Sequence, residues 1–193
     1  IVGLEVHVQL NTETKLFSAA RTAFGAPPNT QVSAYDAAYP GELPVLNRRA
    51  VDACISLGIA LSADVHSRSH FDRKHYFYPD LPSGYQITQQ THPLVSGGKI
   101  TFRVQSHEDR VAKRPAKVKT VHLEQLRLEQ DSGKSLLDHH PSLRFVDLNR
   151  AGVPLIEVVS LPELESAQEA AGYVRELQTL VQYLGISDGS MDE

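Results

Sequence analysis

The sequence predicts an α+β domain in which helices cover one face of a mostly antiparallel sheet. Residues 1–10 alternate between apolar and polar side chains, which is typical of a strand with one exposed face. Two amphipathic helices are predicted, at about 47–61 and 166–185, and further strands lie between them. A strand buried on both faces of a parallel sheet would instead be apolar without interruption.

The first elements follow from local patterns. The alternation places Val2, Leu4, Val6, Val8 and Leu10 on one face of the first strand, and Gly3, Glu5, His7 and Gln9 on the other. Residues 25–44 are rich in Gly, Pro, Asn and Ser and predict a loop. Asn47 is expected to cap the next helix, whose apolar face carries Ala50, Ala53, Cys54 and Leu57.

The middle of the chain is more irregular. Prolines and a glycine in residues 71–86 favour a long irregular loop. A hairpin is expected over 94–104, turning at Ser96-Gly97-Gly98. The basic stretch 107–119 predicts an exposed connection, and two strands follow at about 118–129 and 153–160.

The last helix has the clearest signals. Ser166 is its expected cap, Glu169 completes a capping box and Gly185 ends it. The apolar stripe consists of Ala170, Val174, Leu177, Val181 and Leu184.

Composition limits the class of protein. The chain has 193 residues, of which 41% are hydrophobic and 22% charged, as in one ordinary globular domain. The single cysteine, Cys54, cannot form an internal disulfide, which suits a reducing compartment, and its simplest role is a small buried side chain. No apolar run reaches the ~20 residues of a membrane helix. The chain starts at Ile1 rather than Met, which is consistent with removal of an upstream segment.

The net charge of −4 argues against a domain that grips a nucleic-acid backbone along its length. A local contact with an acceptor end remains compatible with it. The basic residues within 110–119 predict a solvated surface, and an RNA contact is the alternative.

Glu5 and His7 are the first candidates for chemistry. They lie two residues apart on a strand, so both side chains leave the same face, roughly 7 Å apart. A carboxylate and an imidazole placed in this way can share a divalent cation. The alternative is an ordinary exposed face, because Gln9 continues the polar stripe.

Two further carboxylates could complete such a site. Glu129 ends a strand in an acidic cluster, and Arg127 shares its face. Glu157 lies inside a short apolar run, where a lone carboxylate is costly to bury unless it is paired or binds a metal. The alternative for Glu157 is a structural ion pair with an arginine such as Arg150. Oxygen-rich ligands with few histidines favour magnesium.

Segment 71–86 could hold a nucleotide, with rings for a base and cations for phosphates. The candidates are the cations Arg73 and Lys74 and the rings of Tyr76, Phe77, Tyr78 and Tyr85. The alternative is a packed loop with aromatic anchors. No complete phosphate-loop, dinucleotide-binding or common zinc motif is present, which excludes the folds and sites that those motifs define.

Five motifs, in this order, resemble the B subunit of the glutamyl/aspartyl-tRNA amidotransferase. They are the segments 2–7 (VGLEVH), 72–80 (DRKHYFYPD), 84–87 (GYQI), 131–134 (DSGK) and 147–157 (DLNRAGVPLIE). The resemblance implies a glutamine-synthetase-like catalytic domain, also called a cradle. Residues 1–193 would then be a single catalytic domain that stops before its C-terminal strands and the helical tRNA-binding domains.

The resemblance also implies an activity. ATP would phosphorylate the side-chain carboxylate of glutamate mischarged on tRNA(Gln), or of aspartate on tRNA(Asn), and ammonia would displace the phosphate. An amidase subunit would supply the ammonia, and a small C subunit would complete the assembly. Glu5, His7 and Glu129 would hold Mg²⁺, with Glu157 as a further catalytic ligand or orienter. Arg73, Lys74, Tyr76 and Tyr78 would line the nucleotide or acceptor-end side.

One position departs from the family pattern. Bacterial members tend to have two adjacent glutamates where this chain has Glu129 and Gln130. This form, with the basic stretch before it, favours the mitochondrial branch and the mitochondrial matrix, with the bacterial cytoplasm as the alternative. Two other functions stay open: a non-catalytic tRNA-binding scaffold that docks the amidase, and a free-standing ligase or kinase of a small substrate.

Overall fold

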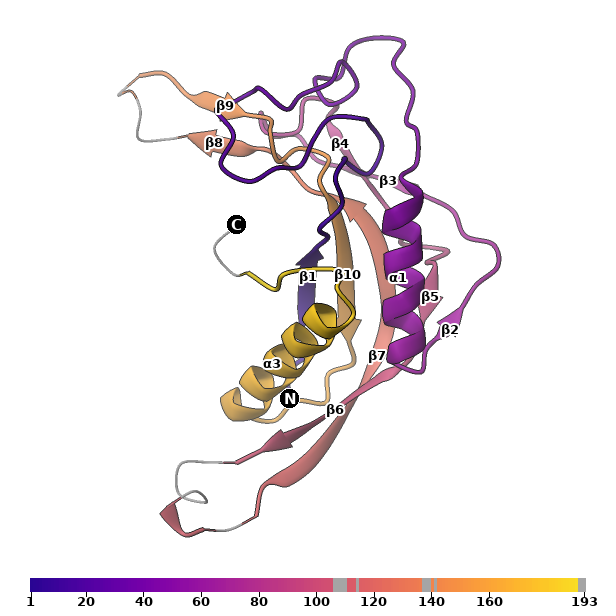
Figure 1. The fold of residues 1–193 in the computed structure, drawn as a ribbon, viewed down its shortest axis with the longest axis vertical. Helices are drawn as coiled ribbons and strands as arrows, with labels where there is room; N and C mark the ends of the chain where they lie inside the picture. Colours follow the sequence, from indigo (N-terminus) through magenta and orange to yellow (C-terminus); the bar gives the residue numbers. More distant parts are fainter. Residues whose placement is uncertain (106–110, 114, 137–139, 141, 191–193) are drawn as a thin grey trace.

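The computed structural model describes residues 1–105, 111–113, 115–136, 140 and 142–190. Its centre is an antiparallel sheet in the order β1-β10-β7-β5-β2, with β6 also paired to β7 (Figure 1). The long strand β7 (Lys117–Gln130) lies between β10 (Pro154–Ser160) and the β5–β6 edge, and β10 pairs in turn with β1 (Glu5–Gln9). Every described strand pair is antiparallel, so the α+β antiparallel prediction is confirmed.

The hairpin predicted over 94–104 is wrong. Strands β5 (Val95–Ser96) and β6 (Lys99–Val104) pair with β7 in one continuous register, so they form a single interrupted strand. Gly97 and Gly98 interrupt it with φ of 67° and 95° and do not reverse the chain. At this point Lys99 N bonds to Leu61 O, and β2 (Asp64–Val65) pairs with β5. The glycines are needed because a Cβ on Gly98 would lie 2.8 Å from that of Ala63.

The irregular loop predicted over 71–86 is also wrong in part. β3 (Asp72–His75) and β4 (Tyr85–Thr88) form a two-stranded hairpin, and only the residues between them are irregular. The prolines and Gly84 lie inside this connection, where they do not interfere with the ladder. β4 packs against β7. A second small hairpin joins β8 (Lys134–Leu136) to β9 (Phe145–Asp147).

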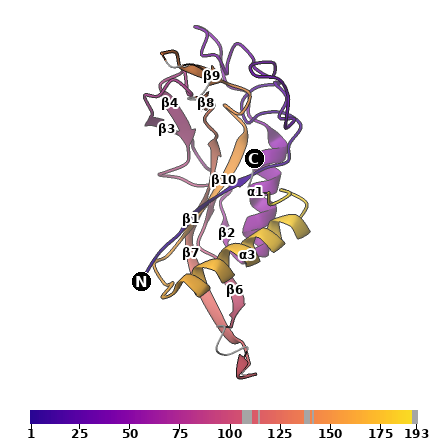
Figure 2. The same ribbon diagram turned by 90° about the vertical axis from the view of Figure 1, so that its left-hand side faces the viewer.

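Both described helices lie on one face of the sheet, while the β3–β4 hairpin lies on the other side (Figure 2). Helix α1 (Arg48–Ala60) is capped by Asn47, whose side chain accepts from Arg49 N. Helix α3 (Ala167–Tyr183) is capped by Ser166, as predicted. The core between helices and sheet contains Val8, Leu57, Leu126, Leu128, Ile156, Val158 and Leu177.

The predicted helix faces are largely those that the fold buries. Ala50, Cys54 and Leu57 of α1 are fully buried, and burial raises the pKa of the Cys54 thiol to about 12. On α3, Leu177 and Val181 are buried with Tyr173, which the predicted stripe omitted. Tyr173 packs edge-on against Phe102 of β6, with ring centroids 6.2 Å apart. Burial raises the pKa of Tyr173.

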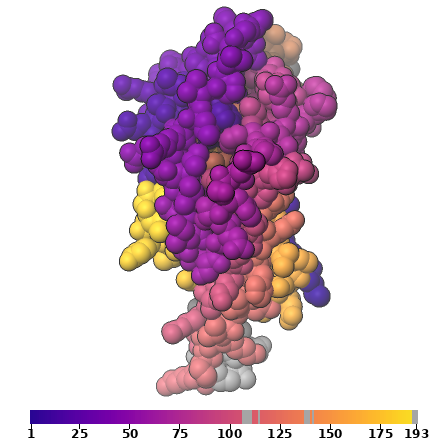
Figure 3. Space-filling model, turned by 90° about the vertical axis from the view of Figure 1, so that its right-hand side faces the viewer, coloured from indigo at the N-terminus to yellow at the C-terminus, as the bar shows by residue number. Residues whose placement is uncertain are grey.

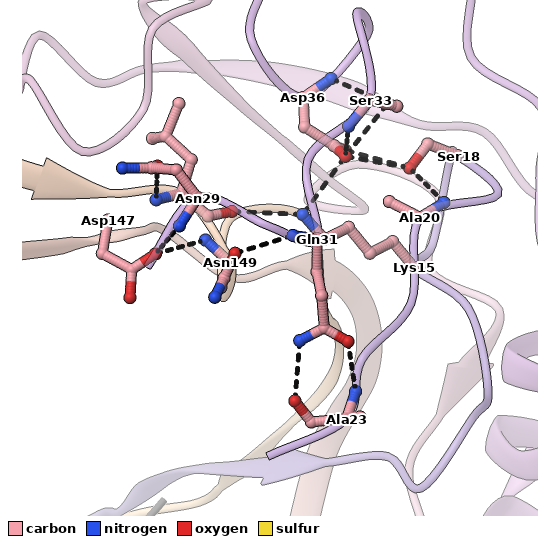
Figure 4. A network of polar contacts seen from close by, with 11 residues as sticks. Lys15, Ser18, Ala20, Ala23, Asn29, Gln31, Ser33, Asp36, Asp147 and Asn149 are labelled. Carbon is pink, nitrogen blue, oxygen red and sulfur yellow. Dashed lines mark hydrogen bonds and ion pairs between the residues drawn. The ribbon is translucent and has the colours of Figure 1, made fainter. Parts of the chain in front are cut away.

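A polar network, buried at the Lys15–Asp36 pair, fixes the long loop between β1 and α1 (Figure 4). Lys15 Nζ donates to Asp36 Oδ2 at 3.1 Å and to Leu148 O at 3.1 Å, and both charged side chains are almost fully shielded. Gln31 N bonds to Asn149 Oδ1 at 2.9 Å. These contacts tie the loop to residues 147–152, which lead directly into β10.

β6 and the first half of β7 form an arm that extends beyond the body of the molecule (Figures 1 and 3). Part of the basic stretch predicted as an exposed connection, including Arg110 and Arg114, lies outside the described residues. Its last part, from Lys117, belongs to β7. Among the described helices, none combines the length and the apolar character of a membrane span.

Candidate functional site

Three polar side chains form a row across the face of the sheet that the helices leave uncovered. The register pairs His7 of β1 with Glu157 of β10, and Glu157 with Arg127 of β7. Because residues two apart share a face, Glu129 lies in the next row on β7. The alternation that buries Val8, Ile156 and Leu128 in the core therefore places His7, Glu157 and Glu129 together on the opposite face.

The side chains of His7, Glu129 and Glu157 converge on one point. His7 Nε2 lies 3.5 Å from Glu129 Oε2 and 3.7 Å from Glu157 Oε1. Ligand atoms of these three residues all lie within 4.8 Å of one another. The two carboxylates are 2% and 6% exposed in their side chains, whereas that of His7 is 51% exposed, so the cluster is open on the histidine side.

In each carboxylate, one of the two oxygens accepts a hydrogen bond from a neighbouring side chain. Thr88 of β4 donates its hydroxyl to Glu129 Oε1. Arg127 Nη1 donates to Glu157 Oε2 at 3.0 Å. The other oxygen of each carboxylate is the one that faces His7. Outer partners of this kind orient the ligands of metal sites.

The shifts in the pKa values of His7, Glu129 and Glu157 follow from this arrangement. The hydrogen bond with Glu129 and the charge of Glu157 raise the pKa of His7, against the effect of its partial burial. Burial alone would raise the pKa of Glu129, but the hydrogen bonds from His7 and Thr88 bring it below its usual value. Burial and the neighbouring charge of Glu129 raise the pKa of Glu157. The cluster thus holds two buried carboxylates that repel each other and attract a cation.

The cluster opens into a cavity of about 570 Å³. Both His7 and Val8 line it although they point to opposite faces, so the cavity wraps around β1 toward α3. Further lining residues are Glu5, Gln9, Lys74, Tyr76, Gln86, Asp131, Leu177, Gln178, Ser187 and Ser190. Burial raises the pKa of Asp131, which adds a third shielded carboxyl to this wall.

The predicted site residues are not all placed alike. Glu5 lines the cavity but is exposed and lies outside the three-residue cluster. Lys74 and Tyr76 also line the cavity. Arg73 instead lies over the ring of Tyr85, 4.9 Å from its centroid. Tyr78 is 64% exposed, and its ring lies 5.0 Å from that of Tyr76.

The alternative of an ion pair between Glu157 and an arginine is confirmed, but the arginine is Arg127 and not Arg150. Arg150 lies 3.5 Å from Asp131 and donates to Ser132 O and Gly133 O, so it braces the turn after β7. Arg127 pairs with Glu157 instead, because the β7–β10 register places the two opposite each other. No pattern in the sequence indicated Thr88 as a residue of the site. Its position depends on the β3–β4 hairpin, which no strand pattern in the sequence indicates.

The donor set fits a divalent cation. Neighbouring ligands of an octahedral Mg²⁺ at 2.0–2.1 Å are about 2.9 Å apart, so the three ligand atoms, which lie within 4.8 Å of one another, would have to draw together to hold one ion. The open histidine side leaves positions for water or phosphate oxygens. Mn²⁺, which accepts imidazole together with carboxylates, fits the same donors.

Comparison with known proteins identifies the family of this chain. A family model described as the GatB/GatE catalytic domain matches residues 1–193. The chain therefore belongs to the GatB/GatE catalytic-domain family.

The B subunits of several bacterial aspartyl/glutamyl-tRNA(Asn/Gln) amidotransferases are similar to the whole chain. That of Paraburkholderia xenovorans is 52% identical over 193 residues, covering 100% of this chain and 39% of the relative. Those of Hahella chejuensis and Acidiphilium cryptum are 51% and 50% identical, each covering 100% of this chain and 38% of the relative. The chain thus spans about two fifths of the length of these relatives.

Proposed function

We propose that this chain carries the site at which ATP activates the side-chain carboxylate of glutamate or aspartate mischarged on tRNA. The γ-phosphoryl group of ATP would pass to a carboxylate oxygen, which releases ADP and leaves an acyl phosphate. Ammonia would then displace phosphate and form the amide of Gln-tRNA(Gln) or Asn-tRNA(Asn). The convergence of His7, Glu129 and Glu157 in an open cavity is the observation that carries this proposal. The names of the relatives supply the substrate class.

Magnesium at this cluster would neutralise charge shared between ATP and the attacking carboxylate. His7, Glu129 and Glu157 would hold it, and Glu5 at the rim of the cavity would contact it through water or take part directly. Glu129 and Glu157 are preorganised for this because each has one oxygen fixed by the protein and the other directed at the site.

The nucleotide or acceptor-end side would be formed by the β3–β4 hairpin. Lys74 places an ammonium group in the cavity, where it can pair with a phosphate. Tyr76 lines the same wall and supports a stacked base. Arg73 and Tyr78 act from the outer side of the hairpin, since Arg73 stacks on Tyr85 and Tyr78 is largely exposed.

The wider assembly is a further part of the proposal. It includes a glutamine-synthetase-like architecture, an amidase subunit that delivers ammonia and a small C subunit. The relatives' names, which describe a subunit of an amidotransferase, support the presence of partner subunits. These relatives are bacterial, which favours the bacterial cytoplasm over the mitochondrial matrix.

Calorimetric titration of ATP into the intact protein, with and without Mg²⁺, tests the proposal. Binding that requires Mg²⁺ and is lost in a Glu129→Gln/Glu157→Gln variant supports it. Glu163→Gln is the matched control, since Glu163 is a carboxylate paired with His122 on the surface. Unchanged ATP binding in the double variant would overturn the proposed position of the ATP site. Absence of ATP binding by the unaltered protein would favour the alternative of a tRNA-binding scaffold, which has no need of converging ligands.

A further inference from the structure

Apart from His7 itself, Arg127 is the one cation in direct contact with the carboxylates of the cluster among the described residues. Its side chain is 18% exposed, and it does not line the cavity that His7, Glu129 and Glu157 share. The guanidinium thus contacts a ligand of the cluster and not the space that a substrate would occupy. Its position therefore favours a role exerted through Glu157.

The guanidinium is fixed on two sides. Nη1 donates to Glu157 Oε2 at 3.0 Å. With the Gln125 amide turned so that its oxygen faces the arginine, that oxygen accepts from Nε at 2.8 Å and also from Nη2. The planar fork of an arginine can satisfy both neighbours at once, whereas a lysine ammonium has no such fixed geometry. Gln125 and Arg127 lie two residues apart on β7, so the strand itself sets this spacing.

The contact with Arg127 gives the two oxygens of Glu157 different surroundings. Because Oε2 is occupied by Arg127, only Oε1 is presented toward His7, at 3.7 Å from Nε2. Glu129 shows the same division, with Oε1 held by Thr88 and Oε2 facing His7. Two buried carboxylates that each offer a single oxygen supply fewer ligand atoms than two carboxylates that bind a cation through both oxygens.

We infer that Arg127 is a positioning residue of the cation site, which holds Glu157 as a one-oxygen ligand. This inference rests on the function proposed above, because it requires that a divalent cation binds at His7, Glu129 and Glu157. It extends that proposal by assigning a role to a residue outside the ligand set. Outer partners of metal ligands typically contribute about 10–100-fold to affinity.

The positive charge of Arg127 should by itself weaken metal binding, which is opposite to the effect of its positioning of Glu157. A cation close to the site repels a divalent ion, so its removal would by itself strengthen metal binding. Loss of affinity on removal of Arg127 therefore identifies positioning as the dominant effect. Arg127→Lys keeps the charge and removes the fork, which separates the two effects.

The test is calorimetric titration of Mn²⁺ alone into the intact protein and its variants. We expect both Arg127→Lys and Arg127→Met to bind Mn²⁺ about 10-fold more weakly than the unaltered protein. Arg103→Met, on the exposed face of β6, is the control and should bind as the unaltered protein does. Thermal unfolding of each variant shows that it is folded, and Arg127→Lys remains informative if Arg127→Met does not fold.

A double-mutant comparison shows whether Arg127 acts through Glu157. In a Glu157→Gln background, Arg127→Met should cause no additional loss of Mn²⁺ affinity. An equal loss with and without Glu157 would overturn the inference, as would unchanged affinity in Arg127→Lys. Failure of the unaltered protein to bind Mn²⁺ would instead overturn the proposed function, and this inference with it.

Discussion

The hydroxyl of Thr88 on β4 donates a hydrogen bond to Oε1 of Glu129 on β7, and so joins the small hairpin to the candidate site. Glu129 is 2% exposed, and its second oxygen faces His7. The β3–β4 hairpin therefore does more than line the cavity, because it also fixes the most deeply buried ligand of the cluster.

Replacement of Thr88 by Val should weaken the site through Glu129. The change removes the hydroxyl donor and leaves a buried carboxylate oxygen without it, which costs about 1–3 kcal/mol of the free energy of unfolding. The pKa of Glu129 should rise, and Mn²⁺ affinity should fall about 10-fold. Urea unfolding and calorimetry measure the two effects. Thr101→Val, at an exposed Thr–Thr pair on the arm, is the control, and equal behaviour of the two variants would contradict the prediction.

Metal affinity should depend on pH through His7. Glu129 and Glu157 raise the pKa of this imidazole above 6.5, and a metal can bind only its neutral form. Mn²⁺ affinity should therefore rise as pH increases through the raised pKa, in a window that lies above pH 6.5. His7→Asn should bind more weakly and lose this pH step. A step of the same size in that variant would assign the titration to another group.

The raised pKa of His7 also affects the stability of the metal-free protein, which should fall rather than rise as pH increases. Since the folded-state pKa of His7 is raised, its stabilising contribution is fully present below pH 6.5 and is lost as pH rises through the folded pKa. Thermal unfolding without metal should therefore show this loss in the unaltered protein and lack it in His7→Asn.

Lys15 should be essential for stability although it lies outside the cavity. Its ammonium group is fully buried against Asp36, and burial lowers its pKa despite that partner. Lys15→Met leaves the Asp36 carboxylate without its cation, which should cost about 3–5 kcal/mol of the free energy of unfolding. Urea unfolding should show this loss, whereas Lys134→Met, at an exposed position on β8, should stay within about 0.5 kcal/mol. A similar small effect of Lys15→Met would show that the network is dispensable.

Tyr173 offers a stabilising substitution. Its hydroxyl is buried with no hydrogen-bond partner among the described residues, while its ring packs on Phe102. Tyr173→Phe keeps the ring and removes the unsatisfied group, so we expect a gain of about 1 kcal/mol, or roughly 2–4 °C in Tm. A lower Tm would show that the hydroxyl is satisfied in solution.

Local pattern was sufficient for the elements whose signals lie within one segment. Alternation in residues 1–10 placed His7 on the face opposite Val8, and the caps Asn47 and Ser166 start the two helices as predicted. The apolar run around Glu157 correctly indicated that this carboxylate needs a partner. These predictions succeed because strand and helix periodicity are properties of consecutive residues.

Tertiary structure decided the features that depend on pairing between distant segments. The sequence could not show whether Arg127 or Arg150 would reach Glu157, because only the β7–β10 register determines which side chains are opposite. In the same way, Gly97 and Gly98 resemble a turn, but their backbone continues one strand along β7.

By itself, then, the sequence determined the antiparallel α+β class, the polar face that carries Glu5 and His7, and the family to which the motifs point. Only the fold decided that the cluster contains Glu157 beside His7 and Glu129, and that Thr88 and Arg127 hold its carboxylates. The physical reason is that a single strand fixes which way a side chain points, whereas its partners are fixed by register across three strands.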